Sequence, residues 1–279
     1  MRRITAVPAS FLTSVLAVAM AGVAASAVAA CSSSSGTAGT GGSTSPAASA
    51  SVSASLSGSI TVFAAASLQE AFTTIGRQFE AAHPGAKVTF SFGASSTLAN
   101  QIINGAPADV FASAAPKNMQ QVVTAGDASD PVNFVKNVME VAVPPSNPAH
   151  VTSVNDLARS SVKVALCQPQ VPCGATAAKV FTNAKITVKP VTLQPDVKSV
   201  LTQVELGNVD AGMVYVTDVN AAGAKVKGIV IPDSVEASTE YPIAPVAKSG
   251  NPSLARAFVA YVLSPAGQAV LTGDKFEKP

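Results

Sequence analysis

Short apolar runs alternate with amphipathic segments along most of this 279-residue chain, and the first such pair lies at Ile60–Ala82. The run Ile60–Ala64 predicts a buried strand. Downstream, apolar residues recur with the 3.6-residue period of a helix, at Leu68, Ala71, Phe72, Ile75 and Phe79. Ser67 lies between the two segments, and we expect it to be the N-cap of a helix at Leu68–Ala82. A helix start has unpaired N–H groups and the positive end of the helix dipole, and both attract anions.

The same alternation of strands and helices continues towards the C-terminus. It predicts further strands at 87–92, 109–113, 133–143, 162–167, 186–193, 211–215 and 228–231. It predicts further helices at 98–104, 116–126, 153–157 and 174–182, one capped by Asp196 and ending at Leu206, a short one from Thr217, and a C-terminal one opened by Asn251 and Pro252. Pro144 and Pro145 end the longest strand and are expected to mark a crossing between lobes. Strands alternating with helices predict an α/β architecture.

The first 58 residues differ in composition from the rest. Two arginines precede an uncharged apolar run at Phe11–Ala30, which ends in Val-Ala-Ala-Cys and resembles a bacterial lipobox. This resemblance implies a lipoprotein signal peptide at 1–31 with Cys31 as the lipid-modified residue. An uncleaved signal anchor is the alternative, because the run approaches the ~20 residues that span a bilayer. Residues 32–58 are almost wholly Ser, Gly, Ala and Thr, a flexible linker. We therefore expect an exported chain anchored to the outer face of the cell membrane.

Residues 59–279 are numerous enough to bury a substantial core. They contain 16 of the 18 basic side chains and all 16 acidic ones, so their formal net charge is zero. This balance argues against nucleic acid as a partner, because nucleic acid is bound through a basic face. If this part of the chain binds an anion, individual hydrogen-bond donors must provide the attraction.

Two cysteines, Cys167 and Cys173, remain when Cys31 carries the lipid. An oxidising compartment and the spacing CQPQVPC favour a disulfide between them, with two free thiols as the alternative. A zinc site is not expected, because zinc takes four ligands and the only histidines, His83 and His150, are far from the cysteines in sequence. Redox catalysis is not expected either, because the spacing is not C-x-x-C.

The common catalytic and nucleotide-binding motifs are missing from the sequence, which contains no G-x-S-x-G, Walker A, G-x-G-x-x-G or H-E-x-x-H pattern. Ser67 would serve as a nucleophile only with a base and an orienting acid beside it. The two candidate bases, His83 and His150, are expected at the surface. An exported serine hydrolase using Ser67 is therefore kept as an alternative function.

Several blocks of sequence, taken in order, resemble the molybdate-binding proteins of bacterial ABC transporters. The blocks are ITVFAAASL from Ile60, SFGASSTLANQI from Ser91, NGAPADVFASA from Asn104, QVPCGATAAKV from Gln170, PDVKSVL from Pro195, NVDAGMVYVTD from Asn208, YPIAPV from Tyr241 and AYVLSPAGQAVL from Ala260. The resemblance covers residues 59–276. It implies the two-lobed periplasmic binding-protein fold of type II, in which helices flank mixed sheets and the ligand cleft lies between the lobes. Lobe 1 is expected at 59–143 and 241–279, and lobe 2 at 144–240.

Proteins of this family hold an oxyanion with uncharged donors from both lobes. Carried onto matching positions, the resemblance implies hydroxyl and N–H groups from Ser67 and Ser95. It also implies backbone N–H groups from Cys173 and Val197, and the phenolic O–H of Tyr215. A small residue such as Ala is expected at position 173 in relatives, so the cysteine affects loop stiffness and pocket size. The implied function is a monomeric receptor without a cofactor, which delivers molybdate and also tungstate to a membrane ABC permease.

A pocket that offers only donors favours a fully deprotonated tetrahedral dianion, because the O–H of a protonated oxyanion needs an acceptor. Phosphate is partly protonated near neutral pH, so we expect such a pocket to reject it unless a carboxylate enters the pocket. Asp196 is the nearest carboxylate in the sequence pattern, and we expect it to cap a helix instead. Sulfate differs from molybdate mainly in size, so a sulfate or thiosulfate receptor is the alternative within this class.

Overall fold

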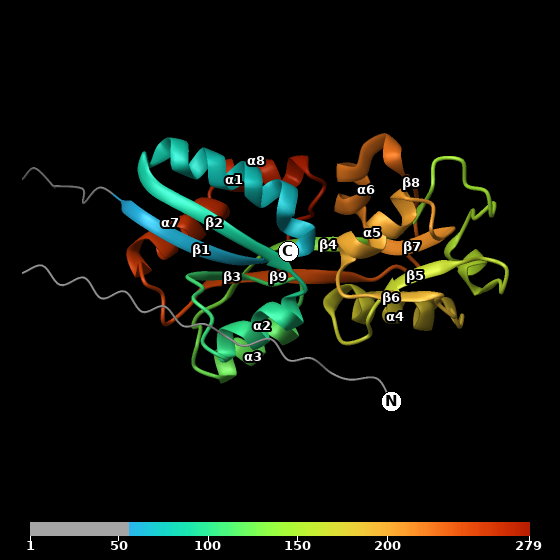
Figure 1. Ribbon diagram of the computed structural model, residues 1–279, viewed down its shortest axis with the longest axis horizontal. Helices are drawn as coiled ribbons and strands as arrows, with labels where there is room; N and C mark the ends of the chain where they lie inside the picture. The colour runs from blue at the N-terminus through green and yellow to red at the C-terminus, as the bar shows by residue number, and fades with distance from the viewer. Residues whose placement is uncertain (1–55) are drawn as a thin grey trace, which may run out of the picture. The chain divides into compact units, whose positions relative to one another are not determined.

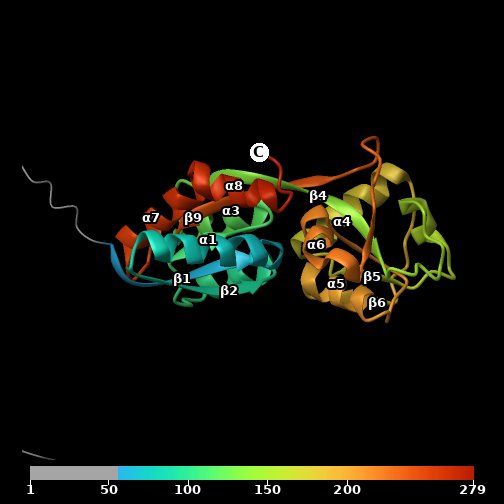
Figure 2. The same cartoon turned by 90° about the horizontal axis from the view of Figure 1, so that it is seen from above.

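The computed structural model describes residues 56–279, which form an α/β unit with two lobes (Figures 1 and 2). The predicted signal peptide, Cys31 and nearly all of the predicted linker lie outside the described residues. The last two positions of that linker belong to β1 (Ser57–Ala65). They are ordered in this strand because β1 pairs along its full length with β2 (Gly85–Gly93).

Lobe 1 is built on five strands in the order β2-β1-β3-β9-β4. The remaining strands of this set are β3 (Val110–Ala112), β4 (Val132–Val143) and β9 (Ser238–Pro245). β1 is parallel to β2 and β3, whereas β9 runs antiparallel to β3 and β4. Side chains alternate along β1, so Val62 and Ala64 join one buried cluster and Phe63 joins another on the opposite face.

Helices cover both faces of this sheet (Figure 1). One face packs against α1 (Gln69–Ala82), α7 (Pro252–Leu263) and α8 (Pro265–Gly273), and the other packs against α2 (Ser95–Ile103) and α3 (Pro116–Thr124). Helix α1 buries the apolar stripe that its period predicts. Within the described residues no single helix meets the length and hydropathy of a membrane span, and the pair α7 and α8, bent by 58°, meets them only when taken together.

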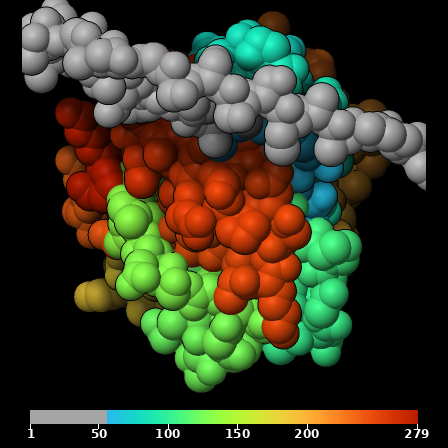
Figure 3. All heavy atoms as spheres, turned by 90° about the vertical axis from the view of Figure 1, so that its left-hand side faces the viewer, coloured from blue at the N-terminus to red at the C-terminus, as the bar shows by residue number. Residues whose placement is uncertain are grey.

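The outer end of lobe 1 is closed by a contact between two distant segments. Figure 3 shows this end, where the orange residues at and before the start of α7 lie beside light-green residues around α3. Ala128 and Val246 form a β-bridge there, and Lys248 Nζ lies 2.9 Å from Asp127 Oδ1. These contacts fasten the returning chain to lobe 1 just before its C-terminal helices begin.

Lobe 2 is built on a second set of strands in the order β4-β7-β5-β6, with β8 beside β4. Its further strands are β5 (Val164–Cys167), β6 (Thr192–Gln194), β7 (Ala211–Tyr215) and β8 (Lys227–Ile229). Its helices are α4 (Pro172–Ala184), α5 (Val197–Glu205) and α6 (Val216–Ala222), with 3-10 turns η2 (Val154–Ala158) and η3 (Gly223–Lys225). β5 is parallel to β6 and β7, as expected for strands joined by helical crossovers.

The long strand β4 belongs to both lobes. It pairs with β9 as far as Val138, and from Met139 onwards it pairs with β7 and β8. The chain therefore passes from one lobe to the other inside a continuous strand, and not after Val143 at the two prolines as the pattern indicates. Apolar residues continue on both sides of the change of partners, at Val138 and Met139, so the sequence gives no signal of where it occurs.

Several predicted elements differ from the structure: the C-terminal helix is divided into α7 and α8, the helix expected at 153–157 is the 3-10 turn η2, and two further elements differ in extent. The strand expected at 186–193 is reduced to β6, because Pro190 cannot donate a ladder hydrogen bond and β5 offers only three pairing positions. Val191 and Leu193 are accordingly 60% and 48% exposed. The helix expected from Leu98 begins three residues earlier, at Ser95, so the start of α2 lies closer to the end of β2.

The aromatic cluster under α1 provides a test of the lobe 1 core. Phe72 is fully buried, and its ring centroid lies 6.2 Å from that of Phe90, 5.9 Å from that of Phe134 and 6.1 Å from that of Phe258. We expect Phe72→Ala to lower the free energy of unfolding by roughly 3–5 kcal/mol, through lost burial and the cavity it leaves. Urea denaturation measures this change. The control Val230→Ala, at a position 78% exposed, should change the value by about 0.5 kcal/mol or less. Equal losses in the two variants would contradict the packing described.

Candidate functional site

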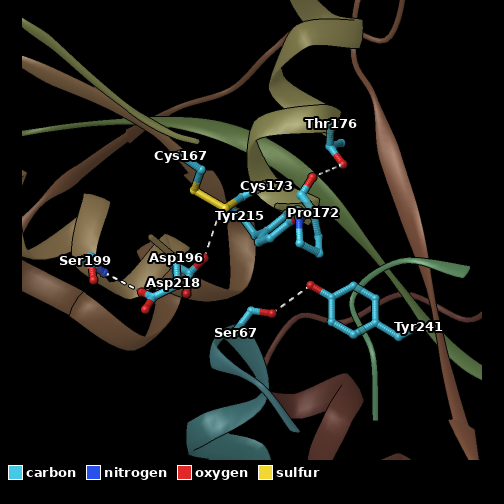
Figure 4. Close-up of a disulfide and its surroundings, with 10 residues drawn as sticks. All are labelled: Ser67, Cys167, Pro172, Cys173, Thr176, Asp196, Ser199, Tyr215, Asp218 and Tyr241. Carbon is cyan, nitrogen blue, oxygen red and sulfur yellow. Dashed lines mark hydrogen bonds between the residues drawn. A yellow bond between two sulfur atoms is a disulfide. The ribbon is translucent and has the colours of Figure 1, made fainter. Parts of the chain in front are cut away.

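A small pocket, open to solvent at its mouth, lies between the two lobes. All five predicted site residues line it: Ser67 and Ser95 from lobe 1, and Cys173, Val197 and Tyr215 from lobe 2. The other lining residues are Ala65, Ala66, Gly93, Ala94, Ala114, Pro172 and Asp196. Figure 4 shows the lobe 2 side of this pocket with Ser67 and Tyr241 facing it. Residues 148 positions apart in the chain, such as Ser67 and Tyr215, thus meet at one place.

Ser67 does not cap α1, and in this respect the prediction is wrong. It lies in a 3-10 turn, η1 (Ala66–Leu68), whose N-cap is Ala65, and α1 begins only at Gln69. The extra turn directs the Ser67 side chain towards the lobe junction, where its Oγ lies 2.8 Å from the hydroxyl of Tyr241. The first N–H groups of such a turn have no partner within it and remain available to a ligand.

Ser95 is the first residue of α2 and is 1% exposed. The backbone N–H of Ala114 donates to its Oγ over 2.8 Å. Because a backbone N–H can only donate, the Ser95 oxygen acts as acceptor in this bond. The hydroxyl proton of Ser95 is therefore free to be donated to another group. Because Ser95 lines the pocket, that group can be a ligand.

Cys173 lies in the first turn of α4, one residue after Pro172, and forms a disulfide with Cys167 at the end of β5. The predicted disulfide is thus present in the structure. It closes the loop between β5 and α4 and holds the start of α4 against the strand end. The N–H of Cys173 belongs to the helix start, where backbone donors have no intrahelical partner.

Val197 is the first residue of α5, and Asp196 is its N-cap. The Asp196 carboxylate accepts a hydrogen bond of 2.8 Å from the N–H of Ser199, so its predicted role as a cap is confirmed. This bond occupies one carboxylate oxygen with the helix itself. The N–H of Val197 remains one of the unpaired donors of the first turn.

Tyr215 ends β7 and is 1% exposed, with its ring centroid 6.3 Å from that of Tyr241. Within the described residues its hydroxyl finds no hydrogen-bond partner. Burial raises the pKa of Tyr215, so the phenol is neutral and keeps its proton. A buried hydroxyl without a partner is costly, and here it belongs to a residue that lines a pocket. This feature is expected of a group that waits for a ligand.

Lys198 connects the two lobes beside the pocket. Its Nζ lies 2.9 Å from Glu70 Oε2 on α1 and 3.0 Å from Asp218 Oδ1 on α6. Burial lowers the pKa of Lys198, but the two carboxylates outweigh this effect and raise it above its ordinary value. The ammonium group is therefore charged, its charge is matched by carboxylates, and Lys198 is not among the residues that line the pocket.

Within the part of the chain that the structure describes, the site therefore gathers neutral donors without a cationic side chain. Three helix starts and the η1 turn supply N–H groups, the serines and Tyr215 supply O–H groups, and the dipoles of α2, α4 and α5 place their positive ends here. Among residues 56–279, Asp196 is the one charged residue in the lining. Among the described residues the hydrogen-bond partner of the Ser67 hydroxyl is Tyr241, and neither histidine lines the pocket, so no histidine is placed beside Ser67 as a base. In residues 56–279 no cluster of His, Cys, Asp or Glu is suited to a metal ion.

Four residues around the site carry no signal that the sequence pattern could reveal. Tyr241, Asn137 and Thr217 form hydrogen bonds behind Ser67, and Lys198 bridges the lobes. Ser67 and Tyr241 are 174 residues apart, and Asn137 and Tyr241 are 104 apart. Tyr241 falls in the block YPIAPV that resembles the molybdate-binding proteins, but the block itself indicates no role for its hydroxyl.

A profile of the family described as bacterial extracellular solute-binding protein matches residues 60–277. The chain belongs to this family. This solute-binding protein is 43% identical to the molybdate-binding protein ModA of Mycobacterium tuberculosis (strain H37Rv) over 238 residues, 85% of this chain and 91% of that protein. It is 34% identical to ModA of Escherichia coli (strain K12) over 221 residues, 75% of this chain and 84% of that protein. The predicted resemblance to the molybdate-binding proteins of ABC transporters is confirmed.

Solved structures agree with this assignment of the fold. The periplasmic molybdate-binding protein of Azotobacter vinelandii matches this solute-binding protein with a TM-score of 0.71 at 21% identity, over 79% of this chain and 99% of that one. The sulfate-binding protein SubI of Mycobacterium tuberculosis matches with a TM-score of 0.69 at 19% identity, over 79% of this chain and 86% of that one. At these identities the matches show the fold alone. The predicted two-lobed periplasmic binding-protein fold is confirmed.

Gly174 provides a test of how tightly the start of α4 is held. A Cβ at this position would lie 2.1 Å from the carbonyl oxygen of Gln168 and 2.9 Å from that of Cys167. Gly174→Ala must therefore displace α4 from the loop that the disulfide closes. We expect the free energy of unfolding, measured by urea denaturation, to fall by roughly 1–3 kcal/mol, the usual cost of overpacking. The control Gly273→Ala places its Cβ where nothing lies within 4 Å and should not cause this loss. Equal urea midpoints for Gly174→Ala and Gly273→Ala would show that the loop between β5 and α4 adapts to the added methyl group without loss of stability.

Proposed function

We propose that this solute-binding protein captures molybdate, and also tungstate, and delivers it to the permease of an ABC transporter. The observation that carries the proposal is the meeting of all five expected donors around one pocket, with the Tyr215 hydroxyl still lacking a partner among the described residues. The names of its relatives in Mycobacterium tuberculosis and Escherichia coli point to the same ligand. In this proposal Ser67, Ser95 and Tyr215 donate O–H groups, and Cys173 and Val197 donate N–H groups.

Neutral donors are sufficient for such a ligand. A hydrogen bond to a charged group contributes about 1.5–3 kcal/mol, so half a dozen would provide on the order of 10–20 kcal/mol. Association costs about 4–15 kcal/mol, which leaves room for micromolar or tighter binding. Because donors come from both lobes, a bound oxyanion stabilises the arrangement in which the lobes are closed on each other.

The position of the receptor in the cell follows from its N-terminal sequence. In the proposal Cys31 carries lipid, and residues 32–55 tether the folded part to the outer face of the membrane. The relative in Bacillus subtilis, 37% identical over 191 residues, is named a putative ABC transporter substrate-binding lipoprotein. A tethered monomer would capture ligand near the permease that receives it.

The ligand is tested by adding molybdate, tungstate, sulfate and phosphate in parallel. We expect molybdate and tungstate to raise the thermal unfolding midpoint in proportion to their affinity, by linkage of binding to folding. Phosphate should raise the midpoint less than molybdate near neutral pH, because its proton needs an acceptor and the one carboxylate in the described lining, Asp196, already accepts a hydrogen bond from Ser199 N–H. Titration calorimetry gives the affinities directly. A midpoint raised by sulfate as much as by molybdate would overturn the molybdate assignment in favour of a sulfate receptor.

The role of Tyr215 is tested by removing its hydroxyl. We expect Tyr215→Phe to weaken molybdate binding roughly 10–150-fold, the equivalent of one hydrogen bond to a charged group. The same change should leave the ligand-free protein at least as stable as before, because it removes a buried group without a partner.

Tyr261→Phe is the matched control, because the Tyr261 hydroxyl lies outside the pocket and contacts Gln78 over 3.4 Å. Calorimetric titration measures binding, and thermal unfolding without ligand measures stability. If the Tyr215→Phe variant binds molybdate as tightly as the Tyr261→Phe variant does, Tyr215 is not one of the proposed donors.

A further inference from the structure

We infer that Tyr241, held by Asn137, fixes the direction of the Ser67 hydroxyl proton and so makes Ser67 a donor to the pocket. Tyr241 is then a positioning residue that determines which protonation state of an oxyanion is bound. The inference rests on the proposed function, in which Ser67 contacts the ligand. It adds a residue that does not line the pocket and that acts only through Ser67.

Tyr241 lies on β9 and is fully buried, and its hydroxyl contacts two side chains. Its oxygen lies 2.8 Å from Ser67 Oγ and 3.3 Å from Asn137 Nδ2. Asn137 lies on β4 and is 1% exposed. The three groups therefore form a buried chain that runs from the strands of lobe 1 to the pocket, and Figure 4 shows its last bond.

The orientation of the Asn137 amide is set by its neighbours. The backbone N–H of Val138 donates to Asn137 Oδ1 over 3.1 Å, so Oδ1 is the acceptor end. Nδ2 then faces Thr217 Oγ1, at 2.8 Å, and the Tyr241 hydroxyl. An amide nitrogen has two protons and no lone pair to offer, so it donates to both oxygens.

The direction of the Tyr241 proton follows from these bonds. Asn137 occupies the Tyr241 oxygen as an acceptor and cannot receive its proton. Within the described residues Ser67 Oγ is the remaining hydrogen-bond partner of that hydroxyl. A buried hydroxyl proton needs an acceptor, so Tyr241 donates to Ser67. Burial also raises the pKa of Tyr241 well above its ordinary value, which keeps this proton in place.

Ser67 is left with its own proton, and the pocket is the space that receives it. If Ser67 donated to Tyr241 instead, the Tyr241 proton would be buried without an acceptor, and Ser67 would present lone pairs to an anion. The second serine is set in the same way, because Ala114 N–H occupies the oxygen of Ser95. Both serine oxygens accept from the protein, so both serine protons serve the ligand. A ligand O–H would meet no acceptor at either serine.

A double-mutant cycle tests whether Tyr241 acts through Ser67. The variants are Ser67→Ala, Tyr241→Phe and their combination, in the full chain, with molybdate affinity measured by titration calorimetry. We expect each single change to weaken binding at least about tenfold. In the Ser67→Ala background, Tyr241→Phe should cause less than about a twofold further loss. Tyr261→Phe should weaken binding in neither background. Independent losses that multiply would overturn the inference.

The preference for molybdate over phosphate gives a second test, because it would not change if Tyr241 only supported the fold. In Tyr241→Phe the Ser67 oxygen is released to accept, so binding of inorganic phosphate, which carries a proton, should improve relative to molybdate. We expect the ratio of molybdate to phosphate affinity to fall at least about tenfold between the wild type and Tyr241→Phe at the acidic end of a series from pH 5.5 to 8.5. An unchanged ratio with both affinities reduced would show that Tyr241 only supports the fold.

A second variant covers the case in which Tyr241→Phe does not fold, as judged by thermal unfolding without ligand. Asn137→Asp keeps the size of the side chain and offers Tyr241 an acceptor, which turns the Tyr241 proton away from Ser67. Asn137→Asp should reproduce the tenfold loss of molybdate affinity and the lower ratio of molybdate to phosphate affinity. If both quantities equal those of the wild type, the inference is overturned. If the wild-type chain binds no molybdate, the proposed function and this inference fall together. If it binds molybdate and the cycle is additive, only the inference falls.

Discussion

The geometry of the site depends on one continuous strand that is hydrogen-bonded in both lobes. The first half of β4 is paired with β9, and its second half is paired with β7 and β8. Because β7 ends at Tyr215 and β9 holds Tyr241, this pairing determines how the two tyrosines face each other across the junction. Backbone ladders are stiff and have little freedom to slip when one face is buried. The donors of the two lobes are therefore positioned by main-chain pairing before any ligand is present.

In the proposed function, the pocket recognises its ligand by desolvated dipoles in place of opposite charge. The ammonium group of Lys198, which follows Val197 of the lining, is already neutralised by Glu70 and Asp218 and lies outside the lining. A cation in the pocket would attract any anion, whereas hydrogen-bond donors with fixed directions discriminate by shape and protonation. The disulfide and the crowded Gly174 serve the same purpose, because a donor that moves by a fraction of an ångström loses much of its selectivity.

Local patterns in the sequence predict that several site residues lie near helix starts, whereas their role in holding an oxyanion comes from the resemblance to the molybdate-binding proteins. Ser95, Cys173 and Val197 lie within one turn of predicted helix starts, because a strand-to-helix transition is visible as a change of hydrophobic period but its exact position is not. The capping role expected for Ser67 was wrong because a 3-10 turn and an α-helix start have the same apolar spacing over so short a stretch. The hydrogen bonds of Tyr241 depend on residues more than one hundred positions away. These contacts depend on the register with which β4 pairs with β9, and no single segment of the sequence determines that register.

The bridge between Glu70 and Lys198 has a consequence for the timing of ligand release. These residues belong to different lobes, so their contact is lost whenever the lobes separate. Their side chains are 45% and 19% exposed, which leaves the attraction open to partial screening by dissolved salt. A bridge of this kind holds the lobes together whether or not the pocket is filled, and so it slows both opening and departure of the ligand. The residence time of the ligand thereby becomes sensitive to ionic strength, although neither Glu70 nor Lys198 lines the pocket.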